Sequence, residues 1–320
     1  MRAASSPIRI ASRGSALARW QAEHVATRLR AAHPGRQVEI VLVRTTGDRV
    51  RDVPLSRIGD RGLFTREVDD QVLADGADAA VHSLKDLPTR LTDGIALGAI
   101  LPREDPRDVL VFADPGARSV QDLPAGARVG TSSLRRRAQL MALRGDLRAP
   151  DVRGNVDTRL RALGEGRFEA LLLAAAGLHR LGARDRIGAY LDPPAWLPAV
   201  GQGALAVTCR AGDGAVARLL APLADPPTAR AVASERALLR KLEGGCQAPI
   251  GALATVAGER LVLHAMAASL DGSAVVRGRE EGPAADAESL GERLADRLAR
   301  EGASAILADA RAAFAGAEGP

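Results

Sequence analysis

Cysteine, aromatic residues and lysine are all scarce in this chain of 320 residues. The two cysteines, Cys209 and Cys246, form no CxxC pair and have no run of histidines beside them. This pattern excludes a disulfide framework and a cysteine-histidine zinc site. Aromatic residues make up 2% of the chain, so the core must be built from Ala, Val, Leu and Ile. We expect a protein of a reducing compartment.

Long apolar runs are also missing. Residues 1–14 contain no apolar core of signal-peptide length, and no stretch approaches the roughly 18 apolar residues that a membrane helix requires. The sequence therefore predicts a soluble, cytoplasmic protein without a membrane partner. The formal net charge is +5, but the basic residues are spread through motifs that also contain acidic ones, and few aromatics could stack on bases. We expect no nucleic-acid partner.

The apolar pattern that is present predicts an α/β protein. Residues 7–11 and 38–43 have the length and apolar character of strands, and apolar residues recur at helical spacing between them. This βαβ unit implies two parallel strands with a right-handed crossover. Similar units continue to about residue 182, interrupted by a Pro-rich link near residue 103. A second Pro/Gly-rich stretch spans residues 193–204. We interpret the two runs as two doubly wound lobes.

Beyond about residue 226 the pattern changes. A helix precedes three strands near 250–256, 261–269 and 274–280, and the dipeptide Asp-Gly between the last two favours a hairpin. A further helix is predicted from Asp286 to a C-cap glycine at Gly302. These elements predict a smaller α+β domain over residues 226–320, with a three-stranded antiparallel sheet that also carries Cys246.

Basic residues follow the predicted strands of both lobes. In α/β sheets, ligands bind beyond the carboxyl ends of the strands, near helix N-termini. Arg135 and Arg136 fall in the first turn of a helix, where a cation is unfavourable unless an anion accompanies it. Two parallel N–H donors make arginine well suited to carboxylates, and no Walker loop or GxGxxG is present. Each arginine taken alone would be interpreted as a solvated surface residue. Because basic residues recur after several strands, we favour a binding site for a small polycarboxylate instead. The arginines concerned are Arg13, Arg135, Arg136, Arg153, Arg159 and Arg180.

Three residues leave two interpretations open at this stage. Lys85 is the only lysine in the first 240 residues, and with Asp86 it forms either a surface ion pair or part of an anion site in which the carboxylate stabilises a developing cation. Cys246 follows two glycines and is either a structural loop cysteine or a thiolate for covalent attachment. Cys209 ends an apolar run and is expected in the core.

Several motifs together resemble the porphobilinogen deaminase (hydroxymethylbilane synthase) family. They include "ADAAVHSLKDLPT", "REDPRDVLV", "VGTSSLRRRAQL", "VRGNVDTRL", "LPAVGQGALAV" and "LEGGCQAPIGA", in order along nearly the whole chain. The resemblance implies a cytoplasmic, monomeric transferase of tetrapyrrole and heme biosynthesis. Such an enzyme condenses four porphobilinogen molecules head to tail and releases ammonia at each addition. Product handover to the next pathway enzyme is a further expectation.

The same resemblance assigns roles to individual residues. It places the dipyrromethane cofactor on Cys246 through a thioether and makes Asp86 the catalytic carboxylate, which also contacts the cofactor. The remaining cofactor-binding positions are Lys85, Ser133, Arg135 and Arg136, and the substrate-binding positions are Arg13, Ser15, Arg153, Arg159 and Arg180.

The resemblance also implies that the two lobes are like periplasmic binding proteins, formed by residues 1–103 with 204–221 and by residues 104–203. Arg57 and Arg61 stand where many family members have lysine, in a segment expected to cover the site. Two functions of other classes stay open on the sequence: a solute-binding module with the same two lobes, and an enzyme that forms a Schiff base through Lys85.

Overall fold

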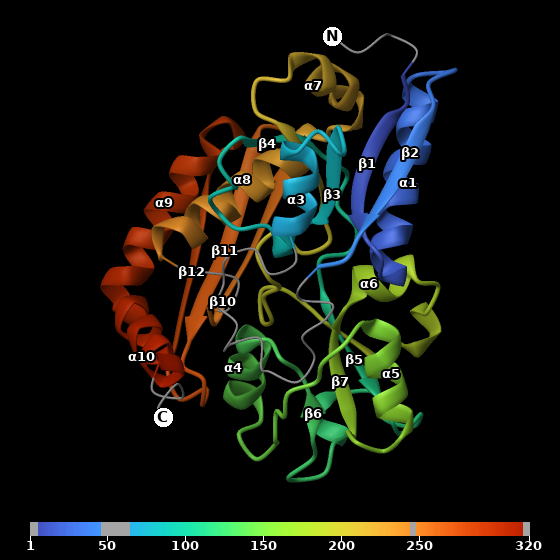
Figure 1. The fold of residues 1–320 in the computed structure, drawn as a ribbon. Helices are drawn as coiled ribbons and strands as arrows, with labels where there is room; N and C mark the ends of the chain where they lie inside the picture. The colour runs from blue at the N-terminus through green and yellow to red at the C-terminus, as the bar shows by residue number, and fades with distance from the viewer. Residues whose placement is uncertain (1–5, 46–64, 244–247, 316–320) are drawn as a thin grey trace.

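The computed structural model describes residues 6–45, 65–243 and 248–315, which form three sheets (Figure 1). The first sheet has the strand order β2-β1-β3-β9-β4. Its strands are β1 (Ile8–Arg13), β2 (Val38–Val43), β3 (Ala79–Ser83), β4 (Ile95–Ile100) and β9 (Leu205–Arg210). β1 is parallel to β2, as the βαβ pattern predicts, and it is also parallel to β3. β9 is antiparallel to β3 and β4.

Helices cover both faces of the first sheet. Val25, Ala26 and Leu29 of α1 (Ala16–Ala32) pack on one face, together with α7 (Gly214–Leu220). Val68 and Val72 of α3 (Arg66–Leu73) pack on the other. Helices on both sides of a mostly parallel sheet define a doubly wound unit, so this part of the predicted fold is confirmed.

The second sheet repeats this arrangement with the order β6-β7-β5-β8. Its helices α4 (Leu134–Leu143), α5 (Val156–Gly164) and α6 (Ala175–Arg180) divide between two apolar clusters, with α4 in one and α5 and α6 in the other. One strand is again antiparallel to its neighbours, here β5. The strands are β5 (Asp108–Phe112), β6 (Val129–Gly130), β7 (Ala170–Ala174) and β8 (Ala189–Leu191).

The chain passes between the two sheets twice. It leaves the first sheet through residues 101–107 and returns through residues 192–204, and each passage is followed by the antiparallel strand of the sheet it enters. The two passages touch, because the amide of Glu104 donates to the carbonyl of Gly203 at 3.2 Å. A Cβ atom on Gly203 would lie 2.2 Å from the carbonyl oxygen of Glu104, so only glycine permits this approach.

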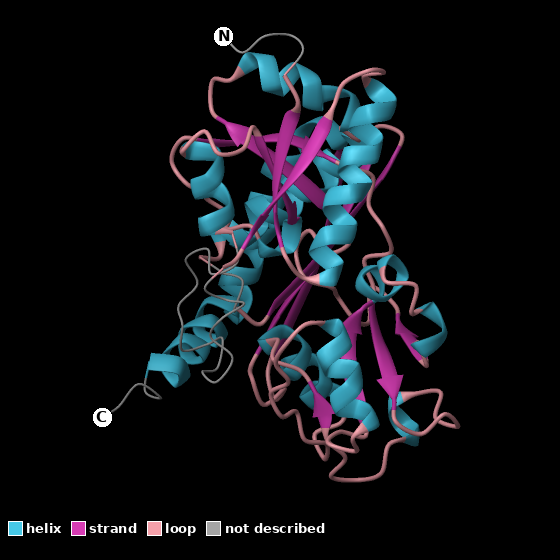
Figure 2. Cartoon of the chain, turned by 45° about the vertical axis from the view of Figure 1, so that its right-hand side comes forward, coloured by secondary structure: helices cyan, strands magenta, loops and turns pink. Residues whose placement is uncertain are grey.

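A third sheet, β10-β11-β12, lies beside the other two and carries helices α8 to α10, which Figure 1 labels and Figure 2 shows from another side. β10 (Ile250–Ala257), β11 (Arg260–Ala268) and β12 (Val275–Pro283) are antiparallel, which confirms the predicted three-stranded sheet. α8 (Pro226–Lys241) and α9 (Ala287–Leu298) pack on it through one apolar cluster. Gly302 has φ +112 and ends the helical run as predicted, and α10 (Ser304–Ala315) follows.

Glu235 of α8 connects this third unit to both chain passages. Its carboxylate is fully buried and pairs with Arg103 at 2.6 Å. It also accepts hydrogen bonds from the amides of Gly201 at 2.7 Å and Ala254 at 2.8 Å. A buried carboxylate satisfied by a cation and two amides fixes the three segments relative to one another.

Candidate active site

One cavity lies where strand ends of the first and second sheets face each other. Its wall includes Ser83 at the end of β3, Ala174 at the end of β7, and Gly203 and Ala204 on the returning passage. The structure places eight residues that the sequence singles out in this wall: Arg13, Ser15, Lys85, Asp86, Arg136, Arg153, Arg159 and Arg180. Segments far apart in the sequence thus deliver seven basic or carboxylate side chains and one serine to a single space.

Local structure explains how these side chains arrive at the cavity. Ser15 is the N-cap of α1 and accepts a hydrogen bond from the amide of Ala18 at 3.3 Å, which fixes the turn that follows Arg13. Lys85 and Asp86 form a short 3-10 helix, Leu84–Asp86, directly after β3. Leu84 is buried in an apolar cluster and anchors this turn, so its two polar neighbours remain at the cavity.

The electrostatics of the cavity are dominated by cations. Burial and, to a smaller extent, the charge of Arg136 lower the pKa of Lys85 to about 8, against the opposing effect of Asp86. Burial also lowers the pKa of Arg159 to about 10, assisted by Arg136 and Arg153. The pKa of Arg180 is lowered to about 10 by burial as well. An anion that binds beside such cations stabilises their charged forms.

Arg153 gives a direct indication of a missing partner. Its Nη2 atom is buried and has no hydrogen-bond partner among the described residues, and burial lowers the pKa of the guanidinium. A buried N–H donor without an acceptor is costly, so native structures rarely leave one. A ligand carboxylate in the cavity would supply the acceptor.

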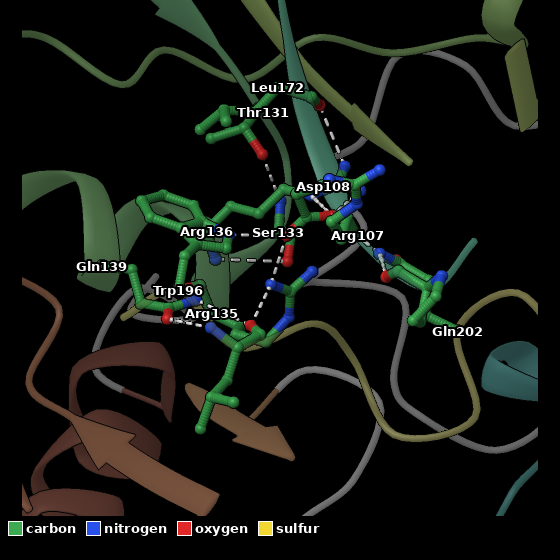
Figure 3. Close-up of polar contacts among 12 residues, drawn as sticks. Arg107, Asp108, Thr131, Ser133, Arg135, Arg136, Gln139, Leu172, Trp196 and Gln202 are labelled. Carbon is green, nitrogen blue, oxygen red and sulfur yellow. Dashed lines mark hydrogen bonds and ion pairs between the residues drawn. The ribbon is translucent and has the colours of Figure 1, made fainter. Parts of the chain in front are cut away.

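Asp108 organises a second charged cluster beside the cavity (Figure 3). It begins β5, is fully buried, and pairs with Arg135 at 2.5 Å and Arg136 at 2.7 Å. Trp196 Nε1 and Gln202 Nε2 each donate to its carboxylate at 2.8 Å. Burial alone would raise the pKa of Asp108, but the charges and hydrogen bonds of the two arginines outweigh this effect and hold the pKa far below its usual range.

This cluster gives Arg135 and Ser133 a setting different from the one expected of them. The guanidinium of Arg135 is directed to Asp108 and to the carbonyl of Leu197 at 2.8 Å, and Arg135 does not line the cavity described above. Ser133 is the N-cap of α4 and accepts from the amide of Arg136 at 3.5 Å. The sequence predicts an anion beside these two arginines at the helix N-terminus. In the structure, the carboxylate of Asp108 is that anion for both. Cofactor binding by Ser133 and Arg135 stays a prediction.

Sequence reasoning missed Asp108 and Gln202 as members of the site. Asp108 stands at the start of an apolar strand, and an acidic residue at the edge of a buried run is a usable signal for an internal ion pair. Gln202 carried no such signal, because its function depends on partners that are 94 and 117 residues away in the chain.

Cys246, Arg57 and Arg61 lie outside the described residues. Cys209 is 2% exposed in β9, as expected for a core cysteine, and burial raises the pKa of its thiol. Within residues 6–45, 65–243 and 248–315, His, Cys, Asp and Glu side chains form no group of three that could hold a metal ion. The helices of these segments include none that is long and apolar enough to cross a membrane.

Known proteins resemble this chain over most of its length. Residues 8–218 match the family model described as porphobilinogen deaminase, dipyromethane cofactor binding domain, and residues 229–300 match porphobilinogen deaminase, C-terminal domain. A porphobilinogen deaminase of Syntrophobacter fumaroxidans is 50% identical over 300 residues, covering 94% of this chain and 96% of the relative. One from a Synechococcus species is 52% identical over 305 residues, covering 95% and 96%.

Among solved structures, a putative methionine-binding lipoprotein of Bacillus subtilis superposes with a TM-score of 0.42 at 11% identity. The superposition covers 68% of this chain and 89% of that one. The first family model spans every described residue that lines the cavity, and its description names the cofactor. The chain belongs to the porphobilinogen deaminase family, whose cofactor is dipyrromethane.

Proposed function

We propose that this chain condenses four porphobilinogen molecules head to tail into hydroxymethylbilane, with Asp86 as its catalytic carboxylate. The observation that carries this proposal is the charge of the cavity, where the Asp86 carboxylate stands among Lys85, Arg136, Arg153 and Arg159. Porphobilinogen bears an acetate and a propionate, so every added unit brings two more negative charges. A site rich in cations suits a polymer that grows in this way.

A carboxylate is needed when porphobilinogen loses ammonia. When the C–N bond of the protonated aminomethyl group breaks, the electron pair leaves with nitrogen as ammonia, and the remaining pyrrole is cationic. Asp86 stabilises this cation and accepts a hydrogen bond from the pyrrole N–H. A new C–C bond then forms at the free α-carbon of the acceptor pyrrole, which loses its proton. The surrounding arginines bind the carboxylates and orient the two rings.

The described residues fit the dipyrromethane cofactor. Its two pyrroles carry the same acid side chains as the substrate. The unpaired Nη2 of Arg153 and the lowered pKa of Arg159 indicate two cations that carboxylates would stabilise. Lys85 and Arg136 line the same cavity and would bind those carboxylates. The cofactor supplies the pyrrole that primes the chain. We assign its attachment to Cys246, the substrate carboxylates to Arg13, Ser15, Arg153, Arg159 and Arg180, and further cofactor contacts to Ser133 and Arg135.

We extend the proposal to the setting of the enzyme. It acts in the cytoplasm as a monomer and hands its product to the next enzyme of tetrapyrrole synthesis. Its domains are residues 1–103 with 204–221, residues 104–203 and residues 226–320. The cavity lies between the first two, and the third would present Cys246 to it.

Intact-mass spectrometry combined with an ammonia assay tests the function. The purified protein should exceed its sequence mass by two linked pyrrole units and should release ammonia when porphobilinogen is added. Cys246→Ala should lose both the added mass and the activity. Cys209→Ala is the matched control, because this thiol is buried in β9 and should leave the added mass in place. An active protein of unmodified mass would contradict the proposal, and binding without ammonia release would indicate a solute-binding module.

A further inference from the structure

Gln202 occupies the point where the returning passage meets both sheets. It is 1% exposed, and its side chain joins partners from different parts of the fold, of which Figure 3 labels Asp108. Nε2 donates to the carbonyl of Pro106 and to Oδ1 of Asp108, both at 2.8 Å. Oε1 accepts from Nζ of Lys85 at 3.2 Å. The side chain thereby contacts the outgoing passage, the second sheet and the loop after β3.

The partners of Gln202 determine which way its amide points. A carbonyl oxygen and a carboxylate oxygen both face Nε2, and neither can donate a hydrogen bond. Reversing the amide would set its oxygen against these two acceptors and its NH2 group against the Lys85 ammonium. The acceptor end is therefore held toward Lys85 by the carbonyl of Pro106 and the carboxylate of Asp108.

The backbone of the same residue is held equally firmly. The carbonyl oxygen of Gln202 accepts from Nε of Arg103 at 2.7 Å, and the guanidinium of Arg103 pairs with the buried Glu235. Gly201, the preceding residue, donates its amide to Glu235. A side chain mounted on a fixed backbone, with a fixed amide orientation, can set the position of the group it binds.

The bonds of Gln202 connect the two charged clusters of the site. Asp108 holds Arg136 through Nε at 3.0 Å and Nη2 at 2.7 Å, and Arg136 lines the cavity together with Lys85. Asp108 therefore fixes the Arg136 guanidinium directly and the Lys85 ammonium through Gln202. A shift of Gln202 would change the distance between Lys85 and Arg136, which line the same cavity.

We propose that Gln202 is a positioning residue that fixes the Lys85 ammonium in the cavity relative to the Asp108–Arg136 pair. The proposal deepens the proposed function, since it rests on the assignment of Lys85 as a ligand-binding group. It makes Gln202 a determinant of both the location and the charge of this lysine, because a hydrogen bond to the charged form stabilises that form.

The two lysines of the chain, Lys85 and Lys241, make the test specific. Protein labelled with ¹³C at the lysine Cε should give two titrating signals, and Lys241→Arg assigns them. Among the described residues, the charged groups that act on Lys85 include Asp86 beside it, Asp108 of β5, and Arg135 and Arg136 of α4. Changing Gln202 keeps all four groups and removes one hydrogen-bond donor from Asp108. Lys241 lies on α8 at the surface and serves as the internal reference in every titration.

Gln202→Met keeps the length of the side chain and removes both ends of the amide. We expect the pKa of Lys85 to fall by about one unit in the cofactor-bearing protein, because a hydrogen bond to a charged group contributes about 1.5 kcal/mol or more. The signal of Lys241 should not move. The pH at which kcat/KM for porphobilinogen declines should fall by the same amount as the Lys85 pKa.

Gln139→Met is the matched control. Gln139 is also a buried glutamine, 3% exposed, but its amide bonds to the backbone of Leu197. This variant should leave the Lys85 pKa unchanged. If Gln202→Met does not fold, Gln202→Asn preserves the amide but is one methylene too short to reach both sides, and should give the same direction of shift.

A Lys85 pKa that stays within about 0.2 units of the parent value in a folded Gln202 variant would overturn the proposal, as would an equal shift in Gln139→Met. The lysine titration does not depend on turnover. An inactive parent protein with a Gln202-dependent Lys85 pKa would therefore refute the proposed function alone, and an active one without that dependence would refute only the positioning role.

Discussion

Replacing Asp108 with asparagine should be among the most destabilising single changes in the second sheet. The carboxylate is fully buried, and the side chains of Arg135 and Arg136 that pair with it are 4% and 7% exposed. Removing one partner of a buried ion pair leaves the other charge uncompensated and typically costs about 3–5 kcal/mol. The new amide would also face Trp196 and Gln202, both donors, with only one acceptor oxygen. We therefore expect Asp108→Asn to lower the free energy of unfolding of this unit by at least about 3 kcal/mol.

Trp196 provides a local probe for this measurement. The chain has two tryptophans, and a Trp20→Phe background leaves only Trp196, whose indole N–H bonds to Asp108 itself. Urea unfolding followed by its fluorescence reports the second sheet without contributions from α1. Asp146→Asn is the control, because Asp146 pairs with Arg144 at a similar distance of 2.7 Å at the surface. Its unfolding midpoint should match that of the background protein.

The loss of unfolding free energy in Asp108→Asn should also become smaller as the pH falls. Asp108 has a folded-state pKa held far below the ordinary value of about 3.9, so its contribution is fully present above that value and is lost as the pH falls toward the folded pKa. The cost of Asp108→Asn should accordingly be about 1 kcal/mol smaller at pH 3 than at pH 7. A loss below about 1 kcal/mol at pH 7, or a cost that grows on acidification, would refute the assignment of Asp108 as the buried counter-charge.

The remaining predictions concern the cavity and the passages. Asp86→Asn should fold with an unchanged unfolding midpoint and carry the cofactor mass, but should lose nearly all ammonia release, because shape is kept and charge is lost; substantial turnover would remove Asp86 from its role. Because the pKa of Lys85 is about 8, its cation is present below pH 8 and lost above it, so the KM for porphobilinogen should rise above pH 8; this rise should disappear in Lys85→Met. Gly203→Ala should lower the unfolding midpoint far more than Gly212→Ala. Both glycines have positive φ, at +89 and +80, but only at Gly203 would the new Cβ collide with a neighbour, the carbonyl oxygen of Glu104; equal effects would show that backbone strain alone is responsible.

Local pattern was sufficient to predict β1, β2 and the third sheet, because apolar periodicity is a property of neighbouring residues. It did not identify β4 or β8. It could not predict that β5 and β9 are antiparallel. Five of the six residues of β9, Leu205 to Cys209, are at most 2% exposed, as are all but one of the residues of β5. A strand buried on both faces shows an unbroken apolar run whichever way it points.

The arginines show the same limit at the site. The position of Arg135 and Arg136 at a helix N-terminus correctly implied an anion, since the helix dipole disfavours cations there. The sequence could not reveal that the anion is Asp108, 27 and 28 residues earlier, because ion pairing across a fold leaves no periodic trace. Likewise, Lys85 with Asp86 was compatible with a surface ion pair. Only the three-dimensional structure shows the lysine bonded to Gln202 at the cavity.

The basic residues of this chain therefore serve two purposes that composition cannot distinguish. Arg135 and Arg136 have their counter-charge inside the protein and hold the site together. Arg153, Arg159 and Arg180 line the cavity with lowered pKa values, and none of the ion pairs among the described residues includes them. Concentrating such cations makes the free cavity unfavourable, and entering carboxylates relieve both the mutual repulsion and the unpaired donors. Binding energy in this site thus comes largely from charges that folding leaves uncompensated, so anionic ligands should stabilise the folded protein as they bind.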